Sequence, residues 1–436
     1  MKCSYSCKSP DHLMARRSFL GNLVGGVGAT ALTSSLTDPI NLSLFAQPPV
    51  AKKLATEQKR MLVIWMAGGA SQLETWDPKP GTSTGGPFLA IPSSVPGTHV
   101  SELIPHTAKQ MHHISLVRGL NTHNDAHDHG AYLMQHLHRE ERGREHPHLG
   151  AVCSKALDRE ERVLPGFIRV TGSGTGTGQD AAYLGARYAS VNLPIDGKPE
   201  NIALVKGLDA KAFRRRALFR QGINSRFDNK RRTADTEAYA YSFEQAEQLM
   251  ARQEIFDASR EPESMKDRYG RHDFGRHCLL ARRLIEHGVS YVQLTHSNYD
   301  THNENFNFHL EQMGEFDVSF ATLIDDMAQR GLLEHTLVCV MSEFGRTPKI
   351  NRFYGRDHWS TAWTVALAGC GIHHGAVVGK TNEKGTQVVD REVHQFHLFH
   401  TYMRALGVDP TDNFIVDGKP IPIADPAHSA IDELLT

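Results

Sequence analysis

Two short apolar segments separated by a long amphipathic helical pattern constrain the fold more than any other feature of the sequence. Residues 289–294 and 336–341 are largely apolar, as expected for strands buried on both faces of a sheet. Between them, apolar residues recur at intervals of three and four before Gly331, and they mark one helix face: Phe306, Leu310, Met313, Phe316, Phe320, Leu323, Ile324 and Met327. Strand, helix and strand in this order predict a right-handed crossover within a mainly parallel sheet.

Weaker signals extend this pattern to an α/β fold with helices on both faces of a central sheet. Residues 61–66 form a continuous apolar run, 113–118 and 166–170 are further candidate strands, and 271–286 is a candidate helix. We expect one domain over 47–436, with a helical or loop insertion around 172–265.

Two parts of that insertion are compositionally unusual. Residues 172–178 are rich in glycine but lack the Lys-Ser/Thr of a nucleotide-binding loop, so we interpret them as a flexible loop. Residues 206–234 are rich in Arg and Lys that alternate with Ala, Leu and Phe. This alternation is typical of a solvated helix face or of a mobile cap over the sheet.

Histidine is the outlier in the composition. The formal net charge of -1 gives no overall electrostatic signature of binding to nucleic acid or to an acidic membrane. The chain nevertheless contains 26 histidines. Many of them fall in one stretch: His106, His112, His113, His123, His127, His129, His136, His138, His146 and His148.

The N-terminal region resembles a twin-arginine export signal. Arg16 and Arg17 precede a mildly apolar stretch rich in Gly, Ala and Thr, and cleavage after Ala46 is plausible. We therefore expect residues 1–46 to direct export to the periplasm or the cell exterior. The four cysteines beyond this segment show no Cys-x-x-Cys spacing, so no disulfide framework is expected, and no other segment is apolar enough to span a bilayer.

Three polar clusters, each just past an apolar run, carry the chemistry of the chain. They are 299–302 with Asp300 and His302, 342–347 with Glu343 and Arg346, and 355–359 with Asp357 and His358. Residues just beyond the carboxyl ends of parallel strands line the ligand crevice of such sheets. Asp, Glu and neutral His are also the side chains that hold divalent metals, and an Asp–His pairing suits zinc or manganese.

Other interpretations of these clusters remain open. Asp300 might only cap the following helix, and Glu343 might only form a structural salt bridge with Arg346. Alternatively, Arg346 would grip a tetrahedral anion with its planar fork of donors.

The order of these motifs resembles that of sulfatases and, over the whole mature chain, of the secreted "domain of unknown function 1501" family in the alkaline-phosphatase-like superfamily. The motifs that carry this resemblance are 68–80, 299–302 with Asn305 and Phe306, 342–348 and 355–359. The superfamily implies a central sheet with helices on both faces and usually two metals at the strand ends. It also implies a hydroxyl or modified-cysteine nucleophile that attacks a phosphate or sulfate ester.

Carried over by position, the resemblance places Asp300, His302 and His358 as ligands of one metal. Glu343 falls where relatives have the Asp of an Asp–His pair, but Phe344 replaces the His. A Gly-Gly pair stands where relatives place a metal-binding Asp, and only Glu74 or Asp77 might substitute for it.

The nucleophile is not identified by the resemblance. The sulfatase motif Cys-x-Pro-Ser-Arg is absent, so formylglycine chemistry is not expected. Thr122 and Ser71 are candidate nucleophiles. His123 and His127, which are four residues apart, would share a helix face and would supply either metal ligands or a general acid. A polar helix start with partly exposed imidazoles is the alternative.

These features favour an exported, metal-dependent hydrolase of phosphate or sulfate esters, acting on a small-molecule or polysaccharide substrate. Zinc or manganese is the expected ion, with calcium or magnesium as alternatives. The metal would polarise the ester and activate water or a hydroxyl, and Arg346 would neutralise charge on the transferred group. The alternative is a non-catalytic relative that binds an envelope polysaccharide or a protein partner. The sequence indicates no oligomeric state.

Overall fold

The computed structural model describes residues 58–158, 164–170, 180–199, 209–228, 234–416 and 418–436. All of them belong to one compact unit that begins at Leu54. The predicted export signal at 1–46 and the glycine-rich residues 172–178 lie outside the described residues. Both therefore stay predictions.

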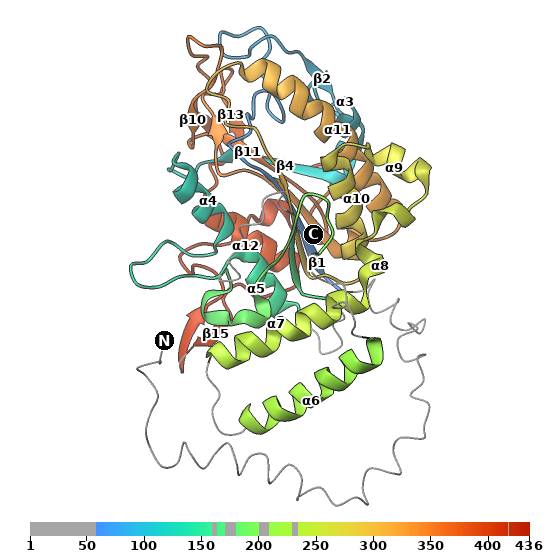
Figure 1. Ribbon diagram of the computed structural model, residues 1–436. Helices are drawn as coiled ribbons and strands as arrows, with labels where there is room; N and C mark the ends of the chain where they lie inside the picture. Colours follow the sequence, from blue (N-terminus) through green and yellow to red (C-terminus); the bar gives the residue numbers. More distant parts are fainter. Residues whose placement is uncertain (1–57, 159–163, 171–179, 200–208, 229–233, 417) are drawn as a thin grey trace, which may run out of the picture. The chain divides into compact units, whose positions relative to one another are not determined.

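An eight-stranded sheet organises this unit (Figure 1), with the strand order β12-β4-β11-β8-β1-β7-β5-β6. Its strands are β1 (Arg60–Met66), β4 (Ile114–Leu120), β5 (Phe167–Val170), β6 (Val191–Leu193), β7 (Tyr291–His296), β8 (Thr336–Met341), β11 (Trp363–Gly369) and β12 (Val377–Val378). Only β11 runs against its neighbours, β4 and β8, and every other pairing in this sheet is parallel. The predicted class, a mainly parallel α/β sheet, is confirmed.

The remaining elements surround this sheet. The helices are α3 (Pro105–Gln110), α4 (His127–Gln135), α5 (Leu149–Ala156), α6 (Ala210–Asp228), α7 (Ala234–Ala251), α8 (Gln253–Phe256), α9 (Glu263–Tyr269), α10 (Asp273–Glu286), α11 (Asn305–Gln329) and α12 (Gln395–Ala405). Four small strand pairs complete the fold: β2 (Ala90–Pro92) with β3 (His99–Ser101), β9 (Gly345–Arg346) with β10 (His358–Trp359), β13 (Lys380–Thr381) with β14 (Val388–Asp390), and β15 (Asn413–Val416) with β16 (Lys419–Pro422).

The central strand β1 is buried along its whole length because both faces of the sheet are covered. Leu62, Ile64 and Met66 join the core beneath α10 and α11, whereas Met61, Val63 and Trp65 join the core beneath α5 and α12. A strand buried on both faces needs apolar residues at every position rather than at alternate ones. This requirement explains the continuous apolar run in the sequence, and the predicted helices on both faces are confirmed.

Element boundaries differ from the prediction by one to three residues. The strand predicted at 289–294 is β7 (Tyr291–His296), and the helix predicted at 271–286 begins at Asp273 with the side chain of His272 as its cap. The segment 172–265, predicted to be an insertion, contains α6, α7 and α8. It also contributes β6, the last strand of the central sheet.

The described part of the chain includes no helix with the length and apolar character needed to cross a bilayer. Its four cysteines, Cys153, Cys278, Cys339 and Cys370, are buried free thiols.

Buried histidines make the stability of the fold depend on pH. Burial lowers the pKa of His296 to about 3, with further lowering by His272 and His277. The unfolded chain therefore binds a proton below about pH 6.5 that the folded chain does not bind until about pH 3. Consequently the free energy of unfolding falls as the pH falls through this window.

We expect His296 alone to lower the free energy of unfolding by about 2–3 kcal/mol at about pH 4.5 relative to neutral pH. Urea denaturation at the two pH values measures this loss. The variant His296→Gln should show a correspondingly smaller loss between the two pH values. An equal loss in the variant and the wild-type chain would contradict this assignment.

Candidate metal centre

Three loops that follow neighbouring parallel strands meet at the carboxyl edge of the sheet. They follow β1, β7 and β8, and they bring together Gly68, Asp300 and Glu343. The backbone N–H of Gly68 donates to Oε1 of Glu343 at 2.8 Å, and Arg346 donates to Oδ1 of Asp300 at 2.6 Å. The convergence that the sequence predicted at this edge is therefore present.

Asp300 is the centre of the site. Its Oδ1 lies 3.2 Å from Nε2 of His358 and 2.9 Å from Nδ1 of His302, and its Oδ2 lies 3.3 Å from Nε2 of His127. Partial burial acts to raise the pKa of Asp300, but the hydrogen bond and charge of Arg346, together with His358 and His302, lower that pKa to about 2. The side chain is therefore a carboxylate throughout the physiological range.

The hydrogen bonds of His127 and His358 fix which ring nitrogen carries the proton. Nδ1 of His127 lies 2.9 Å from the Glu343 carboxylate, and Nδ1 of His358 lies 2.7 Å from the carbonyl oxygen of Asp125. Both oxygens only accept, so each Nδ1 is the donor, and in the neutral tautomer of each ring Nε2 presents a lone pair. Burial and the charge of Arg346 lower the pKa of His358, which favours its neutral form.

With both rings neutral, two imidazole lone pairs therefore face one carboxylate. Nε2 of His127 is buried and has no hydrogen-bond partner. Such an arrangement of acceptors is repulsive unless a cation lies between them. Metal-binding histidines characteristically donate their other ring N–H to a carboxylate or a backbone carbonyl, as both of these do.

The spacing of the donor atoms fits a small metal ion. One donor atom each from His127, Asp300 and His358, which we call the three-donor cluster, lies within 4.8 Å of the others. Donors bound at about 2.0–2.1 Å in a tetrahedral arrangement are roughly 3.3 Å apart. Nε2 of His358 lies 3.2 Å from Oδ1 of Asp300, and Nε2 of His127 lies 3.3 Å from Oδ2, so each imidazole is at this spacing from one oxygen of the carboxylate. Within the described ranges this is the one group of three such residues that meets this criterion.

Of the predicted ligands, Asp300, His358 and His127 are brought together, and His302 lies beside them. Nδ1 of His302 is 3.1 Å from Nη1 of Arg346 as well as close to Asp300. Arg346 can only donate, so the neutral ring of His302 accepts at Nδ1 and carries its proton on Nε2. The side chain of His302 is 49% exposed, which places this ring at the rim of the site.

Glycines at the end of β1 allow the loops to approach so closely. Gly68 and Gly69 have φ angles of 114° and 83°. A Cβ atom on Gly68 would lie 2.4 Å from the backbone nitrogen of Asp300, and one on Gly69 would lie 2.6 Å from the ring of Phe344. No side chain fits at either position without displacing the groups that form the site.

The variant Gly69→Ala should therefore lower the affinity for Zn²⁺ by at least about 10-fold, because the ring of Phe344 packs on two of the metal-binding histidines. Isothermal titration calorimetry measures this affinity. Gly97→Ala is the matched control, because Gly97 has nearly the same φ of 81° but no atom within 4 Å of the added Cβ. Equal affinities in the two variants would show that the close packing at Gly69 does not support the site.

Arg346 braces the site from within the protein. Its side chain is fully buried beneath the site. All five of its N–H groups have acceptors: the carbonyls of Gly68, Gly69 and Arg356, Nδ1 of His302, and Oδ1 of Asp300. This arrangement leaves no donor for a substrate anion, and binding of an anion by Arg346 stays a prediction. Arg346 positions Asp300 and ties it to the end of β1.

Among the described residues, the Glu343 carboxylate accepts hydrogen bonds from groups other than Arg346. Its Oε1 accepts from Gly68 and His127, and its Oε2 accepts from the Ser342 hydroxyl at 3.0 Å. Glu343 therefore orients His127 through its Nδ1 and has no free carboxylate oxygen to offer an ion.

Two other predicted acids are engaged in structural contacts outside the cluster. Glu74 is fully buried and paired with Arg356 at 2.7 Å, and it also accepts from Asn305 at 3.0 Å. Asp77 accepts from Lys79 and Thr381. Neither acid replaces the missing strand-end Asp, because strong local donors already hold its carboxylate.

Asp357 also points away from the ion-binding position. Its Oδ1 accepts from Asn351 at 3.2 Å, and its backbone pairs with Thr347. It therefore shapes the loop that precedes His358.

The candidate nucleophiles and His123 do not join the cluster. The Thr122 hydroxyl donates to the carbonyl of Asn124 at 3.4 Å, and Ser71 is completely buried. The ring of His123 stacks on His394, with the centroids 6.0 Å apart. None of these groups has a described contact with His127, Asp300 or His358.

Phe344 packs against two of the candidate metal ligands. Its ring centroid is 4.4 Å from that of His358 and 4.9 Å from that of His127. The ring packs directly on two metal-binding candidates and offers no donor atom, so this geometry suits one ion rather than two.

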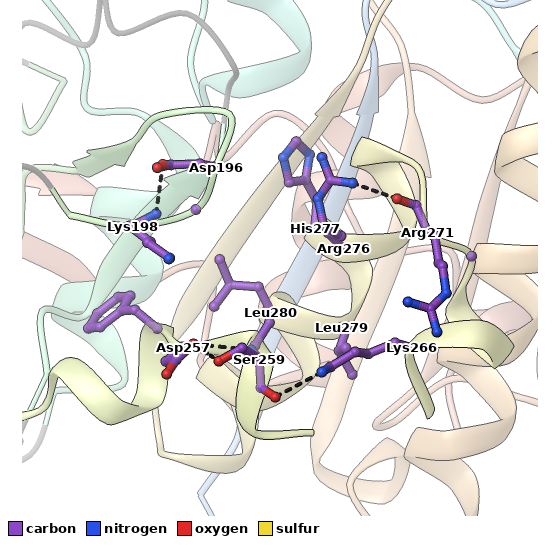
Figure 2. A pocket seen from close by; sticks show the side chains of 14 residues that line it. Asp196, Lys198, Asp257, Ser259, Lys266, Arg271, Arg276, His277, Leu279 and Leu280 are labelled. Atoms are coloured by element: carbon purple, nitrogen blue, oxygen red, sulfur yellow. Dashed lines mark hydrogen bonds between the residues drawn. The ribbon is translucent and has the colours of Figure 1, made fainter. Parts of the chain in front are cut away.

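Two cavities lie elsewhere. One of about 550 Å³ is lined by residues of α9, α10 and the loop after β6 (Figure 2). Three of its cations, Lys266, Arg271 and Arg276, are already paired with oxygen atoms, for example Lys266 with the Ser259 carbonyl at 2.8 Å. The other, of about 740 Å³, lies between the end of α4 and the β15–β16 hairpin. Neither is lined by a member of the three-donor cluster.

Several solved structures match this chain at low similarity. The PsFucS1 sulfatase from Pseudoalteromonas sp. is 12% identical, with a TM-score of 0.35 over 83% of this chain and 72% of that one. The alkaline phosphatase from the Antarctic bacterium TAB5 is 13% identical, with a TM-score of 0.35 over 80% and 98%. The periplasmic domain of EcEptC from Escherichia coli, in complex with Zn, is 9% identical, with a TM-score of 0.38 over 82% and 86%. These likenesses establish no activity for this chain.

No match was found among curated proteins. One protein family, described as "Protein of unknown function (DUF1501)", matches residues 58–435. That match covers nearly all of the chain beyond the predicted export signal and confirms the family that the sequence motifs indicated. The chain therefore belongs to the DUF1501 family.

Proposed function

We propose that this protein is an exported, metal-dependent hydrolase of phosphate or sulfate esters. The observation that carries the proposal is that Nε2 of His127 and Nε2 of His358 both face the Asp300 carboxylate, while each Nδ1 donates to another oxygen. Two neutral imidazoles and one carboxylate form the three-ligand set common in catalytic zinc sites, which keep a further position open for water or substrate. The oligomeric state of the protein is left open.

The donor set favours particular ions. Imidazole nitrogen suits zinc and manganese, whereas calcium and magnesium prefer sites made of oxygen. A bound divalent ion would supply Lewis-acid polarisation of an ester oxygen and a lowered pKa for water.

The residues around the cluster would position these groups. Arg346 holds Asp300 in place through a bond of 2.6 Å, Glu343 orients His127, and the Asp125 carbonyl orients His358. His302, at the rim, has its Nε2 proton available to donate to an ester oxygen. Water is the proposed nucleophile, because the candidate hydroxyls of Thr122 and Ser71 are buried and lie outside the cluster.

Export is part of the proposal and rests on the sequence, namely the paired arginines at 16 and 17 and the Gly/Ala/Thr-rich stretch after them. Twin-arginine export carries folded proteins, which suits a metal that is inserted before export.

Turnover of soluble aryl esters tests the activity. We expect the purified protein to hydrolyse at least one aryl phosphate, phosphodiester or sulfate. Treatment with a chelator should lower the rate by at least about 100-fold, and zinc or manganese should restore it. Activity that is unaffected by the chelator would contradict the proposal.

A second candidate is a non-catalytic member of the family that binds an envelope polysaccharide or a protein partner. It is favoured by Phe344 in place of a second imidazole, by Gly68–Gly69 in place of a metal-binding Asp, and by the full engagement of Arg346. In the same assay, bound metal without turnover of any ester would support this candidate.

A further inference from the structure

The helix α6 (Ala210–Asp228) carries the densest positive charge of the chain. It contains Lys211, Arg214, Arg215, Arg216, Arg220 and Arg226 against the single acid Asp228. Residues 206–232 include ten basic and two acidic residues, a net of +8 within a chain whose formal charge is -1. The near-neutral total therefore conceals one strongly basic segment.

Contacts with α7 (Ala234–Ala251) define the inner side of α6. Nη2 of Arg220 donates to Glu247 at 2.6 Å, and the Arg220 guanidinium lies 4.0 Å from the centroid of the Phe243 ring. At 3.6 residues per turn, the positions at least about 120° around the helix from Arg220 face away from α7. These positions include Lys211, Arg214, Arg215 and Leu218.

The outer side of α6 mixes these cations with large exposed apolar side chains. Leu218 is 68% exposed on this side, Phe219 is 60% exposed at its edge, and Lys211, Arg214 and Arg215 are exposed around them. Adjacent exposed Leu and Phe side chains are unfavourable in water. Their presence among three exposed cations indicates a surface suited to a partner that buries apolar side chains and carries negative charge.

An anionic lipid bilayer provides both negative charge and an apolar environment. Arginine and lysine side chains are attracted to acidic headgroups, while leucine and phenylalanine side chains enter the boundary of the acyl chains. A soluble polyanion would attract only the cationic side chains and would leave Leu218 and Phe219 exposed to water.

We propose that α6 docks this protein on the surface of an anionic lipid bilayer. The helix would lie in the plane of the interface. This docking does not depend on the metal centre or on the proposed hydrolase activity. It assigns a binding role to the segment for which the sequence predicts a solvated helix face or a mobile cap.

Vesicle co-sedimentation of the purified full chain tests the proposal. The wild-type chain should partition at least about 100-fold more strongly onto vesicles of equal parts phosphatidylglycerol and phosphatidylcholine than onto vesicles of phosphatidylcholine alone. The combined variant Lys211→Glu, Arg214→Glu, Arg215→Glu should lose most of this difference. The variant Leu218→Ser, Phe219→Ser should bind anionic vesicles about 10-fold more weakly than the wild type.

A matched charge control separates a local surface from net charge. Arg142, Lys380 and Lys384 are exposed outside α6, so the combined variant Arg142→Glu, Lys380→Glu, Lys384→Glu makes the same change in net charge and should bind like the wild type. All variants keep residues 1–57, so any contribution of that segment is common to them.

Three results would each overturn the proposal. They are equal binding of the wild type to both vesicle types, equal losses in the α6 charge variant and the charge control, and undiminished binding by the Leu218→Ser, Phe219→Ser variant. The last result would indicate simple polyanion attraction. Thermal unfolding of each variant checks that these exposed substitutions leave the fold intact.

Discussion

Replacing His127 or His358 by alanine should lower the affinity of the protein for Zn²⁺ by at least about 100-fold. Either substitution removes one of three donor atoms and leaves Asp300 facing a single imidazole. Loss of a group that merely orients a ligand typically costs 10–100-fold in metal affinity, so loss of a ligand should cost more. Isothermal titration calorimetry on chelator-treated protein measures the effect, and ester turnover should fall in parallel.

His129→Ala is the matched control for this prediction. His129 lies on α4 two residues after His127, is 41% exposed in its side chain and pairs with Glu140 instead of Asp300. The control should bind zinc like the wild type. Equal affinities in His127→Ala, His358→Ala and His129→Ala would show that the metal, if bound, sits elsewhere.

The second large effect concerns stability. The variant Glu74→Gln should lower the free energy of unfolding by about 3–5 kcal/mol, because it leaves the buried charge of Arg356 without its counter-charge. Burial acts to raise the pKa of Glu74, but the charge of Arg356 overrides it and lowers that pKa, so the pair is ionic in the folded chain. Chemical denaturation of chelator-treated protein measures the loss without any contribution from bound metal.

The exposed ion pair between Arg391 and Glu433 supplies the comparison. Its side chains are 37% and 50% exposed. Glu433→Gln should therefore cost no more than about 1 kcal/mol. A similar small cost for Glu74→Gln would mean that the Glu74–Arg356 pair does not hold the loops beneath the site, and that its buried position is incidental.

The central part of the fold was predictable because strands buried on both faces and helices buried on one face have recognisable patterns of apolar residues. β1 and β8 appear as continuous apolar runs, and α11 appears as one apolar stripe that continues for more than six turns. Short strands at the edge of the sheet have weaker apolar patterns in the sequence. β6, only three residues long and partly exposed, lies in a segment predicted to be an insertion, and its place in the sheet depends on pairing with β5 rather than on its own composition.

The candidate site was predictable as a location and as a set of residue types. Asp300 and His358 were placed by the rule that ligand groups follow the carboxyl ends of strands, and the clustering of histidines drew attention to His127. Choosing between His127 and His302 requires the direction of each ring, which depends on the distant partners Glu343 and Arg346. Sequence carries no record of that direction.

The roles of Arg346 and Glu74 were not predictable for a different reason. Each is a charged residue near a functional motif, and such residues serve equally well as reactive groups or as buried braces. The hydrogen-bond partners in the structure decide between these roles. Arg346 has five acceptors, and Glu74 accepts from two side chains, Arg356 and Asn305.

A crystal structure of the zinc-loaded protein, with anomalous diffraction collected at the zinc edge, tests the metal centre most directly. A peak should lie about 2.0–2.2 Å from Nε2 of His127, Nε2 of His358 and a carboxylate oxygen of Asp300, with Glu343 and the Asp125 carbonyl still bound to the two Nδ1 atoms. A zinc-loaded crystal with no peak among these three residues, or with its peak at another group of ligands, would contradict the assignment of the metal centre.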